Sequence, residues 1–280
     1  MPKRVEPKKA DFPANPKEKA SYHLVFCDDF GGTDLDTRKW LPLYLPQWSS
    51  REETRARYSV RNDRLHLRIE EDQHPWSREY NGDIRVSNLQ TGCFSGVVGS
   101  SRGQHPFRDN LTVREEQPTR KLYTPLYGYI EVRLKAVPLA GYLSALWLIG
   151  FEEKPEQSAE ICICEIFGEH VSSEGSQVNY GVHPFNDPNI QDEFYEDMVA
   201  IDASAFHVYA VDWTPERIDF YIDNEKRRTV HQSPDYEMQL MLNVYELPER
   251  LTSESRDAPF PKTMVVDYVR GYQKGAVNSE

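Results

Sequence analysis

The stretch 206–223, FHVYAVDWTPERIDFYID, decides the fold class. In its second half the apolar residues Ile218, Phe220 and Ile222 alternate with more polar neighbours. A period of two is typical of a half-buried β-strand. The link at 214–216, TPE, places a proline where a tight turn favours one. The stretch therefore predicts an antiparallel hairpin.

Alternation of the same kind recurs along the chain, at 64–69, 129–136 and 264–269, whereas helical periodicity is scarce. The runs 142–149 (YLSALWLI) and 238–244 (MQLMLNV) are apolar almost throughout, as central strands buried on both faces are. Many strands of these two kinds in one chain predict an all-β sandwich of two large packed antiparallel sheets.

We expect one sandwich domain over residues 21–275 of the 280-residue chain, because no linker or internal repeat divides this range. Residues 1–20 are rich in Lys, Pro and Glu, a composition that predicts a disordered arm. This N-terminus lacks the apolar segment of a signal peptide. No run of about 18 apolar residues predicts a membrane-spanning helix.

The overall charge limits the classes of partner. With 33 basic and 45 acidic residues, the net charge of −12 argues against a nucleic acid or an anionic membrane surface as the partner and favours a neutral substrate. Aromatic residues make up 12% of the chain, which suits the recognition of sugar rings as well as packing between sheets.

Four cysteines at irregular spacing, Cys27, Cys93, Cys162 and Cys164, do not form the pattern of a disulfide framework. Two residues apart on one strand, Cys162 and Cys164 would have Cα atoms about 6.5–7 Å apart, at the upper limit for a disulfide. We therefore expect free thiols and a reducing compartment.

The stretch 159–169, AEICICEIFGE, contains a pair of carboxylates suited to acid and base chemistry. Strict alternation along a strand would place Glu160 and Glu165 on opposite faces of the sheet. One extra residue in a β-bulge between Cys162 and Glu165 would bring all three side chains to the same face. Bulges are common next to active sites because they redirect a side chain.

The order of motifs along the chain resembles that of the family-16 glycoside hydrolases, the laminarinase-like β-glucanases with a concave jelly-roll sandwich. Their signature is Glu, apolar, Asp, apolar, any residue, Glu, and 160–165 (EICICE) matches it except at Cys162, where the family has Asp. The flanking blocks that resemble the family are 28–40, 127–138, 144–152, 206–223 and 240–245.

This resemblance implies a glycan cleft on the concave face of the sandwich and a retaining, endo-acting hydrolase of β-linked glycans, with β-1,3- or mixed-linkage glucan as the expected substrate. Glu160 would be the nucleophile and Glu165 the general acid/base. The substrate would be a polysaccharide or oligosaccharide, and we expect a monomer. In a retaining pair the two carboxyl groups lie about 5–5.5 Å apart, so that ionisation of one raises the pKa of the other. Cys162 offers only a weak S–H donor where the family Asp helps to set this balance.

Further positions follow from the same resemblance. Trp147 would lie near the sugar in the −1 or −2 region, with a core tryptophan as the competing interpretation. His183 would reach sugar hydroxyls or the acid/base, unless it is a structural histidine. The resemblance requires no cofactor, but it implies a structural Ca²⁺ at Asp29 and Asp267, which could equally be strand-end residues.

Two other features come from the residues themselves. Asn243 is a polar residue in an otherwise apolar strand, which makes it a candidate cleft contact. The long irregular segment at 92–125 lies between two strand patterns, and loops of that length are commonly functional.

Three alternatives stay open at this point. A lectin-like sandwich would bind a glycan without cleaving it, as the loss of the family Asp at Cys162 would allow. A transglycosylase would use the same scaffold to transfer the glycan. A thiolate or metal site could use Cys162 and Cys164 together with His170 or His183, since spaced Cys and His residues are zinc ligands.

The Cys162→Asp substitution tests the role of this position. Restoring a carboxylate between the glutamates is expected to shift the pH optimum or to raise kcat, because a third ionisable group changes how the pair shares its proton. The pH–rate profile of the variant measures this directly. An unchanged profile would mean that another residue has taken over the role.

Overall fold

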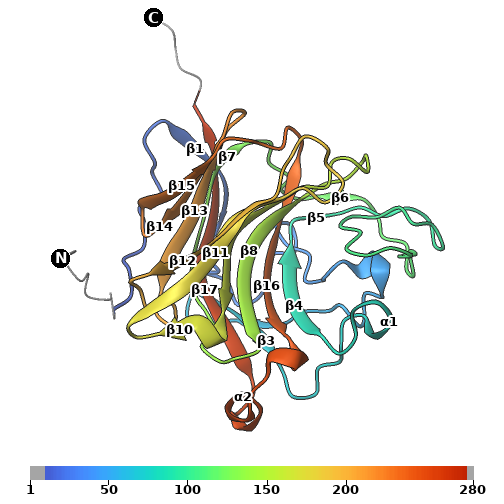
Figure 1. Cartoon of the computed structure of the whole chain (residues 1–280), viewed down its shortest axis with the longest axis horizontal. Helices are drawn as coiled ribbons and strands as arrows, with labels where there is room; N and C mark the ends of the chain where they lie inside the picture. The colour runs from blue at the N-terminus through green and yellow to red at the C-terminus, as the bar shows by residue number, and fades with distance from the viewer. Residues whose placement is uncertain (1–9, 276–280) are drawn as a thin grey trace, which may run out of the picture.

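The computed structural model describes residues 10–275, which form two large antiparallel sheets packed against each other (Figure 1). The predicted all-β sandwich is confirmed. The order of strands within each sheet differs from their order in the sequence, so each sheet combines segments from distant parts of the chain.

The seven-stranded sheet carries the predicted catalytic strand. Its strands are, in spatial order, β10 (Val171–Ser172), β11 (Gly175–His183), β9 (Glu160–Phe167), β8 (Tyr142–Gly150), β16 (Met238–Glu246) and β4 (Arg85–Gln90), with β12 (Glu193–Val199) paired to β11.

The eight-stranded sheet covers the other side of the core. Its strands are β15 (Glu225–Val230), β14 (Ile218–Ile222), β13 (His207–Trp213), β7 (Gly128–Lys135), β17 (Lys262–Lys274), β3 (Leu65–Ile69) and β2 (Arg57–Val60), with β1 (Tyr22–Asp28) paired to β17.

The remaining elements are short. They are the two-stranded pair β5 (Gly92–Cys93) and β6 (Arg120–Lys121), the helices α1 (Arg78–Asn81) and α2 (Ser253–Asp257), and the 3₁₀ turns η1 (Pro46–Trp48), η2 (Gly168–His170) and η3 (Pro248–Arg250). Within residues 10–275, no helix has the length and apolar character needed to cross a bilayer.

The predicted strands occur where the patterns placed them. β13 and β14 form the expected hairpin, in which Trp213 pairs with Ile218. The two apolar runs became β8 and β16, which are neighbours at the centre of the seven-stranded sheet and are buried along almost their whole length. Their inward side chains join those of the other sheet in one hydrophobic core. Each fully buried Leu or Ile there contributes about 1.5–3 kcal/mol to stability.

The predicted β-bulge is present in β9. In the ladder with β8, Leu146 pairs with Cys164 but the next residue, Trp147, pairs with Cys162, so Ile163 is the extra residue. Ile163 and Cys164 consequently both face the core. Glu160, Cys162 and Glu165 face the opposite side, as the bulge hypothesis required.

The partner strand β11 accommodates this distortion with a glycine. Gly181 pairs with Cys162 and has a φ of 149°. A Cβ atom at this position would lie 2.3 Å from the backbone oxygen of Glu193 on β12. Only glycine therefore lets β12 lie this close beside the bulged pair.

Residues 10–20, which the composition assigned to a disordered arm, instead lie along the outer face of the eight-stranded sheet; residues 1–9 of that arm lie outside the described residues. The guanidinium of Arg133 donates two hydrogen bonds to the backbone oxygen of Phe12, at 2.9 and 2.6 Å. The side chain of Asn15 donates to Glu131 at 2.8 Å, and its backbone oxygen accepts from Arg270 at 2.8 Å. Buried charged side chains on the sheet thus find partners in the backbone of the arm, which composition does not reveal.

Deleting residues 1–16 is expected to destabilise the domain by about 2–3 kcal/mol, because hydrogen bonds to the charged groups of Arg133 and Arg270 are lost. Urea unfolding followed by tryptophan fluorescence measures the change. A chain lacking only residues 1–9 retains these contacts and is the control. Equal unfolding midpoints for the two truncated chains would contradict the assignment.

Candidate active site

A cleft of about 610 Å³ lies on the outer face of the seven-stranded sheet. Four neighbouring strands contribute to its lining: β9 provides Glu160 and Glu165, β8 provides Trp147, β11 provides His183 and β16 provides Tyr245. The bulge in β9 brings Glu160 and Glu165 into the same cleft. The lining runs from Tyr44 to Leu247, so residues far apart in the sequence meet at one site.

Both glutamates are held in conditions that favour the protonated form. Burial raises the pKa of Glu160 well above its ordinary value, and the nearby carboxylates of Glu165 and Glu152 raise it further. Burial also raises the pKa of Glu165, although His183 and the thiol of Cys162 act in the opposite direction. A pair of this kind retains a proton at a pH where isolated carboxylic acids have lost theirs.

Cys162 lies between the two glutamates, at the position where the family signature has Asp. Its Sγ is 3.9 Å from Oε2 of Glu160, and its thiol also interacts with Glu165. Burial and the two carboxylates raise the pKa of this thiol well above its ordinary value. Cys162 is therefore a neutral S–H donor between two acids.

His105 reaches the site from the long segment at 92–125. Its Nδ1 lies 3.0 Å from Oε1 of Glu160, and its ring meets that of Trp147 edge-on at 5.4 Å between centroids. Burial lowers the pKa of His105 to about 4, so the imidazole is neutral near pH 7. A neutral ring leaves the carboxyl group of Glu160 without a counter-charge from this side.

Glu152 fixes the backbone of His105. Its Oε1 accepts a hydrogen bond of 2.6 Å from the backbone N–H of His105. Burial raises the pKa of Glu152 to about 8, and the same hydrogen bond offsets part of the effect. Glu152 is thus a protonated acid at neutral pH whose carbonyl oxygen anchors the loop.

His183 lies beside the pair on β11, opposite Glu160 in the ladder. Its Nδ1 is 2.5 Å from Oδ1 of Asp192, and its ring stacks on Phe194 with centroids 4.5 Å apart. These contacts fix the ring so that its other nitrogen faces the catalytic strand. The predicted role toward the acid/base agrees with this position, and its contact with sugar stays a prediction.

Trp147 and Asn243 have different positions relative to the cleft. Trp147 borders the cleft but is only 5% exposed and packs in a buried hydrophobic cluster, so its contact with sugar stays a prediction. Asn243 is fully buried beneath the cleft surface, where its amide donates to the hydroxyl of Tyr245 at 2.9 Å. Tyr245 in turn donates to Tyr44 at 3.0 Å. Asn243 therefore supports a cleft residue and does not itself line the cleft.

Asp29 and Asp267, the expected calcium ligands, do not fit that role. Oδ2 of Asp267 accepts a hydrogen bond of 2.7 Å from Arg133. Asp29 pairs with Lys17 and, at 3.2 Å, with Arg270. Both carboxylates already neutralise fixed positive charges, which would repel a cation. These ion pairs argue against calcium at Asp29 and Asp267, which stays a prediction.

The hypothesis of a site built from both cysteines of the Cys162-x-Cys164 pair is also wrong. The bulge turns Cys164 into the hydrophobic core, while Cys162 packs with the residues on the cleft side. His170 belongs to η2, where its ring contacts Phe167. All four cysteines of the chain are free thiols, as expected.

Several functional side chains could not be read from the sequence. They are His105, Glu152, Tyr44, Phe185, Asp192 and Tyr245. The length of the segment at 92–125 was the one signal that pointed to His105. Phe185, at 42% exposed, offers an aromatic face at the mouth of the cleft. Only the fold determines which loop residues meet the strands.

The sequence profile of the glycosyl hydrolases family 16 matches residues 117–257, half of the chain and the half that contains both glutamates. The chain belongs to glycosyl hydrolases family 16. The family resemblance seen in the motif at 160–165 is thereby confirmed.

Among solved structures, this family-16 chain is similar to the GlcNAcα1-4Gal-releasing endo-β-galactosidase of Clostridium perfringens, with 33% identity and a TM-score of 0.80 over 94% of this chain and 65% of that one. It is also similar in fold to the laminarinase catalytic domain of Thermotoga petrophila, with 19% identity and a TM-score of 0.65 over 90% and 98% of the two chains.

A curated relative is glucan endo-1,3-β-glucosidase A1 of Niallia circulans, which is 23% identical over 91% of this chain. The alignment spans 38% of that protein's length. This family-16 chain therefore spans well under half the length of that relative.

Replacing Glu152 by Gln is expected to stabilise the protein more as the pH rises. Its pKa is about 8 in the folded chain against 4.5 ordinarily, so between these values the folded chain binds a proton that the unfolded chain releases. Stability then falls with rising pH by up to about 1.4 kcal/mol per pH unit, and Gln removes this loss.

Urea unfolding of both proteins at pH 5, 6.5 and 8 measures the effect. The gain in unfolding free energy should be small at pH 5 and largest at pH 8. Glu156→Gln, at an exposed position nearby, is the control. A gain that is the same at all three pH values would contradict the buried, protonated state of Glu152.

Proposed function

We propose that this chain is a retaining, endo-acting hydrolase of β-linked glycans that works by double displacement. Glu160 is the nucleophile and Glu165 the general acid/base. The observation that carries the proposal is the bulge at Ile163, because it turns both glutamates of β9 into one cleft. Membership of family 16 supports the same reaction class.

The reaction requires the two glutamates to differ in protonation when the substrate binds. In the first step the carboxylate of Glu160 attacks the anomeric carbon, and Glu165 gives its proton to the leaving glycosidic oxygen. In the second step Glu165 takes a proton from water, whose oxygen attacks the same carbon and releases Glu160. One proton must therefore reside on Glu165 when the substrate binds.

Burial raises the pKa of both glutamates, that of Glu160 well above its ordinary value, so this distribution of the proton depends on donors that stabilise the carboxylate of Glu160. Nδ1 of His105 lies 3.0 Å from Glu160 without a hydrogen bond between them, and an N–H at this nitrogen turned toward the carboxylate would favour the ionised form. The thiol of Cys162, 3.9 Å from Glu160, offers a second weak donor. Burial of Glu165 favours its protonated form, as an acid catalyst needs.

Aromatic groups in the cleft support a sugar as the ligand. Trp147, Tyr245 and Phe185 present ring surfaces around the two glutamates. Sugar rings have apolar C–H faces that pack on aromatic rings, and the edges of Tyr and Trp add hydrogen-bonding groups. The cleft is open at the surface beside Phe185, which suits a chain that continues beyond the cleavage point.

A β-galactosidic linkage is the preferred substrate in this proposal. The motifs of the sequence implied a β-glucan, whereas similarity to an endo-β-galactosidase reaches 33% identity over 94% of this chain. At 19% identity, the likeness to a laminarinase supports the fold alone. We therefore place glycans with internal β-galactosides ahead of β-1,3- and mixed-linkage glucans.

Glycan cleavage by matched variants tests the proposal. Release of reducing ends should be faster on O-glycans that carry terminal GlcNAcα1-4Gal than on laminarin or lichenan. Glu160→Gln is expected to abolish turnover, and Glu165→Gln to lower kcat by about 10²–10⁴-fold. Glu174→Gln, at an exposed turn after β10, should behave as the unmodified protein.

Other outcomes would replace the proposal by one of its alternatives. Binding to a glycan without turnover on any of them would identify a lectin-like sandwich. Products longer than the starting oligosaccharide would identify a transglycosylase. Full activity in Glu160→Gln would exclude this residue as the nucleophile.

A further inference from the structure

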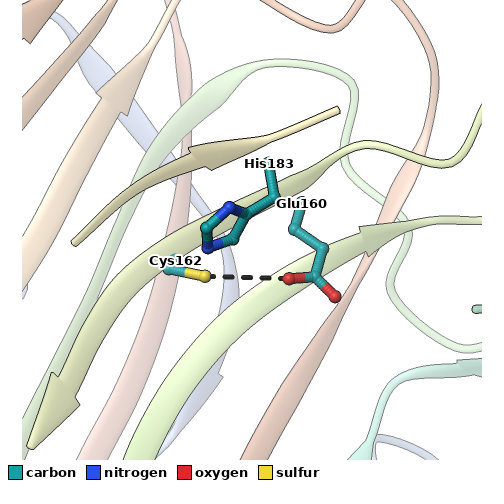
Figure 2. A group of neighbouring side chains, drawn as sticks. All are labelled: Glu160, Cys162 and His183. Carbon is teal, nitrogen blue, oxygen red and sulfur yellow. Dashed lines mark hydrogen bonds between the residues drawn. The ribbon is translucent and has the colours of Figure 1, made fainter. Parts of the chain in front are cut away.

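Glu160, Cys162 and His183 form a compact cluster that hydrolysis alone does not explain (Figure 2). One potential ligand atom from each residue, a carboxylate oxygen, a thiol sulfur and a ring nitrogen, lies within 4.8 Å of the other two. On β9, Sγ of Cys162 lies 3.9 Å from Oε2 of Glu160. Neither thiol nor imidazole is needed for attack by one carboxylate and protonation by another.

The donor set of this cluster is that of a zinc site. Zn²⁺ prefers Cys sulfur, His nitrogen and carboxylate oxygen in a tetrahedral arrangement. With bonds about 2.0–2.3 Å long, neighbouring ligand atoms in a tetrahedron lie about 3.3–3.8 Å apart. Small rotations of three side chains would bring the present cluster to that spacing.

His183 is already oriented as a metal ligand would be. Its Nδ1 contacts Asp192 at 2.5 Å, and Figure 2 shows the other ring nitrogen directed toward the sulfur of Cys162. Zinc-binding histidines typically donate their second N–H to a carboxylate, which fixes the tautomer and the ring plane. The stacked ring of Phe194 restricts the imidazole further.

We propose that Glu160, Cys162 and His183 bind one Zn²⁺ ion when the cleft contains no glycan. Three protein ligands leave the fourth tetrahedral position to water or to the neighbouring Glu165. Binding releases the thiol proton of Cys162 to solvent and leaves the proton shared by the two glutamates on Glu165, because zinc is bound by the thiolate and carboxylate forms.

Zinc at this position would regulate the enzyme. The ion would occupy the oxygen of Glu160 that attacks the sugar, so metal and substrate would exclude each other. This consequence rests on the proposed function, whereas binding of the metal does not. The soft thiolate of Cys162 would thus favour zinc, whereas the oxygen of an Asp at this position would suit harder cations.

Titration of the metal-free, reduced full-length protein with Co²⁺, a spectroscopic substitute for zinc, tests the site directly. One equivalent should produce the near-ultraviolet absorption of a cobalt–thiolate bond, and Zn²⁺ should abolish it. Cys162→Ser should lose the band. It should also bind Zn²⁺ at least about 100-fold more weakly, because loss of a metal ligand costs more than the 10–100-fold typical of losing a residue that hydrogen-bonds to a ligand. Asp192→Ala should weaken binding about 10-fold, since this partner is exposed.

Cys164→Ser is the matched control, because Cys164 lies on the same strand but faces the core. It should retain the band. Should this variant fail to fold, Cys27→Ser replaces it, since Cys27 lies outside the cleft beside Asp29. A band that persists in Cys162→Ser, or the lack of saturable binding to the unmodified protein, would overturn the proposal.

Activity provides a separate measurement. Zn²⁺ should inhibit glycan cleavage, and a chelator or excess glycan should restore it. If the protein binds one Zn²⁺ but cleaves no glycan, the proposed function fails and the metal site stands. If it cleaves glycans but shows no cobalt–thiolate band, the metal site fails alone.

Discussion

The constraint on which the site depends is that a carboxyl group cannot be buried unpaired in the hydrophobic core. Strand β9 must bury Ile161, Ile163 and Ile166 against the other sheet. Strict alternation would bury Glu165 with them. The extra residue at Ile163 removes this conflict, because it lets the apolar side chains fill the core while both glutamates face the cleft. Burial of the isoleucines and the exposure of both glutamates to the cleft thus require the same bulge in β9.

Three groups around the glutamates are neutral near pH 7. His105 has a pKa of about 4, Glu152 has a pKa of about 8, and burial keeps Cys162 as a thiol. Three ionisable side chains therefore lie around the pair without adding charge. In such an environment the charge of Glu165 raises the pKa of Glu160, which is the condition for one proton to be shared between them.

The sequence predicted most of the fold and about half of the site, for physical reasons that differ between residues. Alternation and apolar runs predicted β8, β13, β14 and β16 correctly, since burial on one or two faces leaves a direct pattern. The bulge was predictable because the glutamates conflicted with that pattern. His105 was not predictable, because a loop contact depends on the path of the whole segment at 92–125. The contact between Arg133 and the arm was missed because backbone carbonyls have no signature in composition.

The measurement that tests the central claim most directly is the anomeric configuration of the first product, followed by proton NMR during cleavage of a β-linked glycan. If Glu160 and Glu165 act as a retaining pair across one glycosidic bond, the β-anomer must appear first and convert to the equilibrium mixture by mutarotation. An α-anomer as the first product would contradict the account, because it would require water to attack directly between two more widely separated carboxyl groups.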